Sequence, residues 1–412
     1  MDIKKINRMK GFIITIIIVA SSGFYYAQTT TNVEGSQFQF KEVVRHDDSP
    51  VESQGRTGTC WSFSALSFLE SEIMRTTERE KPIILSEMFI VRKAYEAKAK
   101  KYIRMDGRTN FGEGGAFHDI PYVIKNYGIV PQSEYTGLAK KGDRYNHGDM
   151  FDQLNEIVTT AKSEGSGIQK DWLDAYSKVL DEKIGVLPET FKYEGEKYTP
   201  KSFYEMLGID MEDYVSLTSF TNHPMYEKCM LQIPDNWLWD ESYNVGINDL
   251  YETVLYALKS GYTVAWGADV SEKGFSFQNG LAIVPLEKEQ IVVEGEDNKN
   301  FSDAGADKKS TVFTRPDAEV VVTQEMRQEG YDNKETTDDH GMHIVGLYKD
   351  KKGRNFFLVK NSWGTSNYPE GYLYVSEPYF KLKTINIYIH KDGIPDSLKS
   401  KLERNFQMTL GL

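Results

Sequence analysis

A glycine-containing turn that runs directly into a long apolar segment constrains this chain more than any other feature. The stretch "SQGRTGTCWSFSAL", residues 53–66, places Cys60 at the junction. From Cys60 to Lys81 there is neither Gly nor Pro, and apolar residues recur at near-helical spacing at Phe63, Leu66, Leu69 and Ile73. The pattern predicts a helix that is buried on most sides and begins at Cys60. The positive end of the helix dipole then lies at the Cys60 sulfur, which favours the thiolate over the thiol.

The N-terminal residues have the pattern of an export signal. Four basic residues precede the apolar run "GFIITIIIVASSGFYYA", and a polar segment follows it. This arrangement predicts a signal peptide over residues 1–27 and a mature chain over residues 28–412 that is periplasmic or secreted. An uncleaved N-terminal anchor is the alternative, because the apolar run is of marginal length for a membrane span. No other stretch predicts contact with a membrane.

The predicted mature chain is acidic. The full sequence has 49 Lys and Arg against 61 Asp and Glu, and the signal carries four of the basic residues and one acidic residue, which leaves a net charge near −15. Binding to phosphates requires a positive face, so this charge argues against a nucleic-acid partner. With 40% hydrophobic residues the chain has enough apolar side chains for a core, in one elaborated domain or two closely joined ones.

The middle of the chain is predicted to be a mainly helical insertion, at about residues 138–250. Charged, helix-like segments such as "FDQLNEIVTTAKSEG" and "DWLDAYSKVLDEKIG" alternate there with Gly and Pro. Beyond it, the alternation and the β-branched residues of "YTVAWGADV" predict a strand. The acidic stretch at residues 294–311 lacks the spacing of an EF-hand, so we expect a solvated loop there and no metal site.

The chain has two cysteines, Cys60 and Cys229, so an exported form contains at most one disulfide. A bridge between them is one interpretation of Cys60. The other is a reactive thiol, which must stay reduced and needs a proton acceptor beside it. Histidine is the common side chain that titrates near neutrality, and the sequence contains seven of them.

A predicted hairpin near the C-terminus singles out one histidine. The segments "HGMHIVGLY" and "NFFLVKNSW" flank the turn "KDKKGR". With the turn centred near residues 351–352, Asn361 lies diagonally near His340 on the same face of the hairpin. The Asn361 amide oxygen then accepts a hydrogen bond from the His340 ring and fixes its tautomer. His343 points to the other face and is interpreted as structural, and we expect Trp363 to cover the His340–Asn361 hydrogen bond.

The loop before Cys60 supplies a candidate for stabilising negative charge. Gln54 precedes Cys60 by six positions, and Gly55 and Gly58 allow the loop between them to fold back. The side-chain amide of Gln54 and the backbone N–H of Cys60 are therefore the predicted donors to a developing oxyanion.

Together these segments resemble the papain-like cysteine peptidases. "QGRTGTCWSF", "GGAFHDIPYVIKNYGIVP", "DHGMHIVG" and "VKNSWG" occur in that family's order, and a Gly follows His340 by six positions as it does in the family. Thr57 stands where the secreted papain-type enzymes have a Cys, and the interval from Cys60 to His340 is much longer than theirs. Both features, and the lack of room for a large folded pro-region before Cys60, resemble the bleomycin hydrolase and aminopeptidase C branch.

The resemblance implies an α+β papain-like fold, in which the buried helix carrying the nucleophile packs against an antiparallel, barrel-like sheet and a large helical insertion is added. It also implies a homohexameric ring, peptide substrates, and no metal or cofactor. The residues to which it gives roles are the catalytic Cys60, His340, Asn361 and Gln54, the substrate-binding Gly114 and Gly115, and the supporting Trp61 and Trp363.

The sequence thus predicts a cysteine peptidase that cleaves peptide bonds through a Cys–His–Asn acyl-enzyme mechanism, as an aminopeptidase of the bleomycin hydrolase type. In that branch the C-terminal carboxylate holds the amino group of the substrate, whereas the tail "ERNFQMTLGL" does not resemble theirs. Two alternatives therefore stay open. One is an endopeptidase with an open cleft, and the other is a peptide-binding protein on the same scaffold that does not turn over.

Overall fold

The computed structural model describes residues 29–77, 81–140, 142–161, 167–286, 290–294 and 307–409. The predicted signal peptide at residues 1–27 and most of the polar loop predicted at residues 294–311 lie outside this part of the chain. Within it, no helix has the length and the apolar character that a membrane crossing requires.

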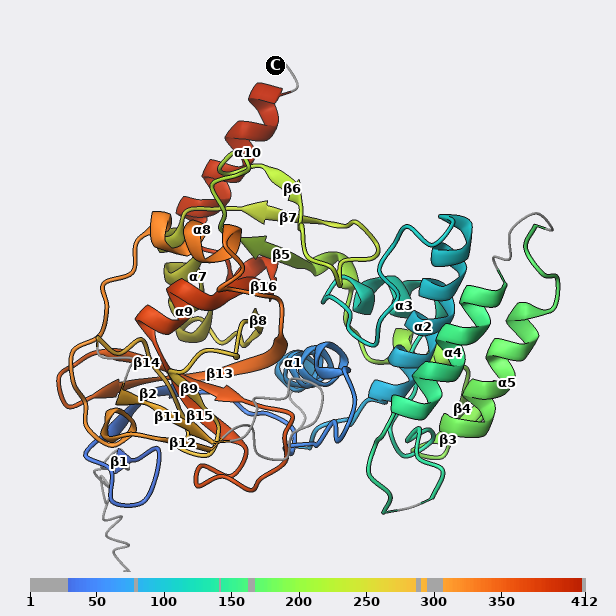
Figure 1. The fold of residues 1–412 in the computed structure, drawn as a ribbon, viewed down its shortest axis with the longest axis horizontal. Coiled ribbons are helices and arrows are strands. Elements are labelled where there is room, and N and C mark those ends of the chain that lie inside the picture. Colours follow the sequence, from blue (N-terminus) through green and yellow to red (C-terminus); the bar gives the residue numbers. More distant parts are fainter. Residues whose placement is uncertain are drawn as a thin grey trace, which may run out of the picture.

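The helix that begins at Cys60 lies between two parts of the molecule (Figure 1). This helix, α1, spans Cys60–Thr77 and is buried continuously from Cys60 to Met74, as the unbroken apolar run predicts. Helices α2 to α5 lie on one side of it, and the strands of the main sheet lie on the other (Figure 1).

The helical part packs its apolar side chains against one face of α1 in a single hydrophobic core. A small hairpin, β3–β4, accompanies the helices at one end (Figure 1). The elements of this part are α2 Glu87–Arg104, α3 Asp119–Tyr127, α4 Gly148–Thr160, α5 Trp172–Ile184, β3 Phe191–Tyr193, β4 Glu196–Tyr198 and α6 Pro200–Met206.

The other part is built on one 12-stranded sheet, whose main path runs β6-β7-β5-β16-β8-β13-β14-β15-β10-β9, with β2 beside β13 and β1 beside β2. All neighbours are antiparallel except the pairs β10–β15 and β5–β7. The strands are β1 Thr29–Thr30, β2 Phe40–Arg45, β5 Tyr214–Thr218, β6 Lys228–Met230, β7 Glu241–Asn244, β8 Val264–Ala268, β9 Phe275–Ser276, β10 Leu281–Ala282, β13 His340–Asp350, β14 Asn355–Lys360, β15 Tyr372–Ser376 and β16 Thr384–His390. The α+β prediction is confirmed, although the pairing path does not close into a barrel among the described strands.

Four helices accompany this sheet, and a separate hairpin lies beside it. Helices α7 and α9 contribute to the second hydrophobic core with the strands. Their bounds, and those of the other elements, are α7 Ile247–Lys259, α8 Gln324–Asp332, α9 Glu377–Lys383, α10 Asp396–Thr409, β11 Val292–Glu294 and β12 Asp307–Lys309.

The range predicted as a helical insertion, about residues 138–250, contains both kinds of element. Its helices α4, α5 and α6 lie within residues 148–206, whereas β5, β6 and β7 within residues 214–244 belong to the main sheet. These strands have three to five residues each, too short for periodicity to distinguish them from helix, so the helical segment ends well before residue 250.

Strand β13 is the element that brings the two parts together. Its first half, from His340 to Ile344, pairs with β8, and its second half, from Gly346, pairs with β2, while β14 lies along its other edge. The predicted hairpin is therefore present, with a bulge between Ile344 and Gly346. Because β13 also packs against α1, His340 at its first position reaches the start of that helix.

The buried face of α1 also carries a carboxyl group, Glu70. Its Oε1 accepts a hydrogen bond of 2.8 Å from the backbone N–H of Leu85. Burial raises the pKa of Glu70 to about 7, against the opposing effect of the ammonium group of Lys360. Neighbouring carboxyl groups of Glu52 and Glu87 lie in the same cluster, and burial raises their pKa values as well.

We predict that Glu70→Gln changes how stability depends on pH. Because the folded state raises the pKa of Glu70 from 4.5 to about 7, it binds more protons than the unfolded state in that interval, and stability falls as the pH rises through it. Gln keeps an acceptor for Leu85 but does not titrate. The variant should therefore gain on the order of 2 kcal/mol over the wild type between about pH 5 and pH 8.

Urea denaturation at the two pH values measures this difference. Glu212→Gln, at a glutamate whose side chain is 74% exposed, is the matched control and should follow the wild type. If the free energy of unfolding of Glu70→Gln changes between pH 5 and pH 8 by as much as that of the wild type, the assignment of a protonated carboxyl group to this site is contradicted.

Candidate active site

Cys60 opens on a cavity of about 440 Å³ that His340 also lines. The cysteine is the first residue of α1, and the backbone N–H groups of Gly341 and Trp61 are near enough to its sulfur to lower the pKa of the thiol. The contact with Gly341 places the first residues of β13 directly beside the sulfur. The structure therefore brings together Cys60 and His340, which lie far apart in the sequence.

This contact depends on the absence of a side chain at Gly341. A Cβ atom there would lie 2.6 Å from Oγ of Ser64 and 3.4 Å from the carbonyl oxygen of Cys60. The first of these distances is shorter than real Cβ contacts, so any other residue would push β13 away from α1. Sequence reasoning missed Gly341, although a glycine directly after the predicted histidine is a usable signal.

The ring of His340 is oriented by Asn361. Nε2 of His340 lies 2.7 Å from Oδ1 of Asn361, which also accepts the N–H of Ser362 at 2.8 Å. Because a carboxamide oxygen only accepts hydrogen bonds, Nε2 carries the proton and Nδ1 of His340 is left with its lone pair. Nδ1 is buried and has no hydrogen-bond partner, and its ring lines the cavity. This is the orientation that a general base beside Cys60 requires.

Trp363 covers this pair of side chains. Its ring centroid lies 4.7 Å from that of His340, with an angle of 37° between the rings, and Trp363 is buried. Phe275 and Phe277 pack against the other edges of the indole, with near-perpendicular rings. The indole thereby shields the His340–Asn361 hydrogen bond from solvent, as the sequence predicts.

The electrostatic environment differs from the prediction of a resting thiolate. Burial raises the pKa of the Cys60 thiol to about 12, and the carboxylates of Asp338 and Asp235 add to the rise, whereas the N–H groups of Gly341 and Trp61 lower it. Burial also lowers the pKa of His340 to about 4, which its bond to Asn361 opposes. Burial thus opposes the thiolate that the helix dipole favours, because desolvation penalises the charged forms of both side chains.

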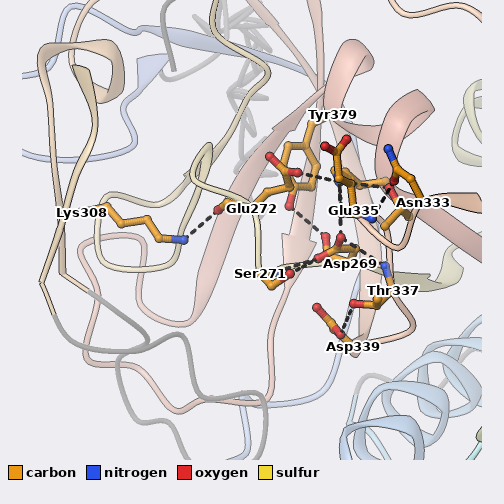
Figure 2. Close-up of polar contacts among 11 residues, drawn as sticks. Asp269, Ser271, Glu272, Lys308, Asn333, Glu335, Thr337, Asp339 and Tyr379 are labelled. Carbon is orange, nitrogen blue, oxygen red and sulfur yellow. Dashed lines mark hydrogen bonds and ion pairs between the residues drawn. The ribbon is translucent and has the colours of Figure 1, made fainter. Parts of the chain in front are cut away.

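A polar cluster fixes the chain just before His340 (Figure 2). Asp269, which follows β8, accepts bonds from the N–H and the hydroxyl of Ser271 at 2.8 and 2.7 Å, and from the N–H of Thr337 at 3.3 Å. Thr337 in turn donates its hydroxyl to Asp339 at 2.7 Å. Lys383 binds Asp269 from the other side at 3.3 Å. The residues preceding β13 are thus held on both sides, which sets the position of His340.

Gln54 lies near the nucleophile but is turned partly away from the cavity. Its Nε2 donates to the carbonyl of Thr57 at 2.7 Å, and its Oε1 accepts the hydroxyl of Ser362 at 2.7 Å. Gly58 of the same loop lines the cavity, whereas Gln54 is not among the described residues that line it. Ser362, which adjoins Asn361, therefore fixes the carboxamide, and this role was not predicted from the sequence.

Gly114 and Gly115 form one wall of the cavity. A Cβ atom on Gly115 would lie 2.6 Å from Oδ2 of Asp119 and 2.8 Å from the ring of Trp61, so the glycine loop packs directly on these side chains. The indole N–H of Trp61 donates to the carbonyl of Glu113 at 3.2 Å. Trp61 therefore anchors the glycine loop beside the nucleophile.

The remaining candidates lie away from the cavity. Nδ1 of His343 lies 2.9 Å from the hydroxyl of Ser67, on the far side of β13, consistent with its structural interpretation. Cys60 and Cys229 are both free thiols, so the alternative of a bridge between them is not realised. Burial raises the pKa of Cys229 to about 11. In the part of the chain that the structure describes, no three or more His, Cys, Asp and Glu side chains are grouped to hold a metal ion.

The site combines a cysteine at the start of a helix with a histidine on a neighbouring strand, and an asparagine orients that histidine. This arrangement defines the papain-like class of cysteine peptidases. The model of the Peptidase C1-like family matches residues 6–303 and 281–410 of this chain. The chain belongs to this family, and the resemblance to its bleomycin hydrolase and aminopeptidase C branch is confirmed.

Similar proteins of known name include aminopeptidase C of Lactobacillus delbrueckii subsp. lactis, 23% identical over 86% of this chain and 82% of that protein. Bleomycin hydrolase of Rattus norvegicus is 25% identical over 90% of this chain and 87% of that protein. Among solved structures, PepW from Lactobacillus rhamnosis HN001 superposes with a TM-score of 0.67 at 19% identity, over 89% of this chain and 85% of that one. The papain-like fold and the cysteine-peptidase class are therefore established for this protein.

We predict that Asn361→Ala is less damaging than loss of the nucleophile. Cys60→Ala should abolish hydrolysis of a fluorogenic peptide amide, because no other group can form the acyl-enzyme. Asn361→Ala should lower kcat roughly 10- to 100-fold, because His340 keeps its packing on Trp363 but loses the partner that fixes its tautomer. Steady-state kinetics measures the activity of the two variants, and thermal denaturation checks that each is folded.

Asn355→Ala is the matched control, since Asn355 lies at the far end of the same hairpin and binds the hydroxyl of Tyr251. It should retain wild-type activity. A folded Asn361→Ala protein as inactive as Cys60→Ala would contradict a purely orienting role, and activity in Cys60→Ala would remove Cys60 from the mechanism.

Proposed function

We propose that the protein is an aminopeptidase, which removes residues from the amino end of peptides by a Cys–His–Asn acyl-enzyme mechanism. The observation that carries the proposal is the lone pair of His340 Nδ1, which is buried without a partner on the cavity that Cys60 also lines. The names of the similar proteins, aminopeptidase C and bleomycin hydrolase, support the same activity.

In the first half of the reaction, Nδ1 of His340 takes the proton of the Cys60 thiol as the sulfur attacks the scissile carbonyl carbon. The low pKa of His340 makes the resulting imidazolium a ready proton donor. It passes the proton to the nitrogen of the leaving amine, the C–N bond breaks, and a thioester to Cys60 remains. The proton of the thiol thus reaches the leaving nitrogen through His340.

Negative charge on the carbonyl oxygen requires donors in place. The backbone N–H of Cys60 and the side-chain amide of Gln54 are our candidates for these donors. An amide nitrogen carries two hydrogens, and the carbonyl of Thr57 accepts only one of those on Gln54. The second hydrogen is therefore the one that we assign to the oxyanion.

In the second half, Nδ1 of His340 takes a proton from water while the water oxygen attacks the thioester carbonyl. The C–S bond breaks, the acyl half leaves as a carboxylic acid, and the proton returns to the Cys60 sulfur. Cys60 and His340 are then ready for the next substrate. Assembly into a hexameric ring and export from the cytoplasm stay predictions from the sequence.

Substrate preference tests the proposal. A fluorogenic aminoacyl amide with a free amino group should be hydrolysed at least 10-fold faster, in kcat/KM, than its N-acetylated peptide counterpart under reducing conditions. Cys60→Ala is the blank, and Cys229→Ala is the matched control that should keep activity, since Cys229 is buried in β6. Preference for the acetylated peptide would indicate an endopeptidase, and Cys60-dependent turnover of neither would indicate a peptide-binding protein.

A further inference from the structure

The cavity beside Cys60 is lined by carboxylates. Glu113, Asp235, Asp338 and Asp339 all contribute to its wall, and no Lys or Arg side chain among the described residues does. The ammonium group of Lys98 donates to the carbonyls of Gly112 and Gly114 in this wall, but the four carboxylates outnumber it. The cavity therefore favours a ligand that carries a positive charge.

Glu113 and Asp339 each accept a hydrogen bond from the protein chain. Oε2 of Glu113 accepts the N–H of Gly58 at 2.8 Å. Asp339 accepts the hydroxyl of Thr337 and belongs to the cluster around Asp269. The other two, Asp235 and Asp338, lie close enough to Cys60 to raise the pKa of its thiol, in addition to the larger effect of burial.

Asp235 lies on the substrate-binding wall of the cavity. A Cβ atom on Gly114 would be 1.9 Å from Oδ2 of Asp235, so the carboxylate occupies the space directly over this glycine. Nδ2 of Asn110 donates to Oδ1 of Asp235 at 2.9 Å and orients the group. By contrast, Asp338 lies in the segment just before β13, two residues ahead of His340.

The loop that carries Asp235, residues 231–240 between β6 and β7, is pinned at several points. Trp237 is buried, and its indole N–H donates to Oδ2 of Asp119 at 2.7 Å. Nδ2 of Asn236 donates to the carbonyls of Leu231 and Asp240 at 2.8 and 2.9 Å. Asp235 is therefore a fixed feature of the cavity rather than a side chain on an unsupported loop.

We propose that the carboxylate of Asp235 binds the protonated α-amino group of the peptide substrate and so restricts cleavage to the amino end. The inference rests on the proposed function and names the residue that gives it its specificity. A peptide whose scissile carbonyl lies at Cys60 and whose backbone passes Gly115 and Gly114 meets Asp235 next, and its chain must end there. Up to Thr409, helix α10 leads away from α1 (Figure 1), so the described part of the C-terminal segment does not supply this carboxylate.

Calorimetry in the Cys60→Ala background tests the contact without requiring turnover. A short peptide with a free amino group should bind at least 10-fold more tightly than its N-acetylated counterpart. Asp235→Asn, which keeps an acceptor for Asn110, should remove most of this difference. Asp338→Asn removes the same charge from the opposite wall and should leave the ratio within about twofold.

The pH dependence separates a direct contact from a structural effect. With Asp235 present, the binding ratio should fall as the pH rises past about 8, where an α-amino group loses its proton. With Asp235→Asn the ratio should not depend on pH. If Asp235→Asn leaves the ratio unchanged, or if Asp338→Asn lowers it equally, the assignment to Asp235 is overturned.

Steady-state kinetics of Asp235→Asn with the free-amino and acetylated amides distinguish the role of Asp235 from the proposed peptidase activity. With turnover that depends on Cys60, Asp235→Asn should lower kcat/KM at least 10-fold for the free-amino amide but not for the acetylated one. If the wild type turns over neither substrate but still binds the free-amino peptide more tightly than the acetylated one, the peptidase proposal is contradicted. The role of Asp235 then stays in place. If Asp235→Asn turns over both substrates with the same ratio of kcat/KM values as the wild type, only the role of Asp235 is overturned.

Discussion

The close approach of β13 to the start of α1 is the contact on which the rest of the site depends. It is permitted by Gly341, whose missing side chain lets its N–H reach the sulfur of Cys60. The same approach brings His340, the preceding residue, into the cavity, while β14 supplies Asn361 behind it. The sheet and the helical part on either side of α1 keep both elements buried, so the geometry does not rely on exposed loops.

Burial has two consequences for the chemistry. It raises the pKa of Cys60 and lowers that of His340, since desolvation penalises both charged forms. It also strengthens any interaction made inside the cavity, because few water molecules compete there. The negative wall, which disfavours the thiolate, is then explained by the ligand it is built to receive: a peptide that brings its own positive charge.

The elements nearest the chemistry were predicted from local sequence, and the spatial relations between distant segments were not. The run after Cys60 has helical spacing without Gly or Pro, so α1 was predictable, and parity along the hairpin placed Asn361 beside His340. The raised pKa of Cys60 was missed because burial is a property of the whole fold. Asp235 was missed because a short loop without periodicity carries it, and only the tertiary structure brings this loop over Gly114. The strands after residue 213 were missed for the same reason: β5 pairs with β16, far away in the sequence, and β7 and β6 extend the sheet from β5.

The central claim is that Cys60 forms the covalent intermediate with its substrate. Mass spectrometry of the protein quenched in acid during turnover of an activated aminoacyl ester tests it most directly. An added acyl mass is expected on the proteolytic fragment that contains Cys60, with its loss in Cys60→Ala and no added mass at Cys229. Turnover without an adduct at Cys60, or with the acyl group on another residue, would contradict the account.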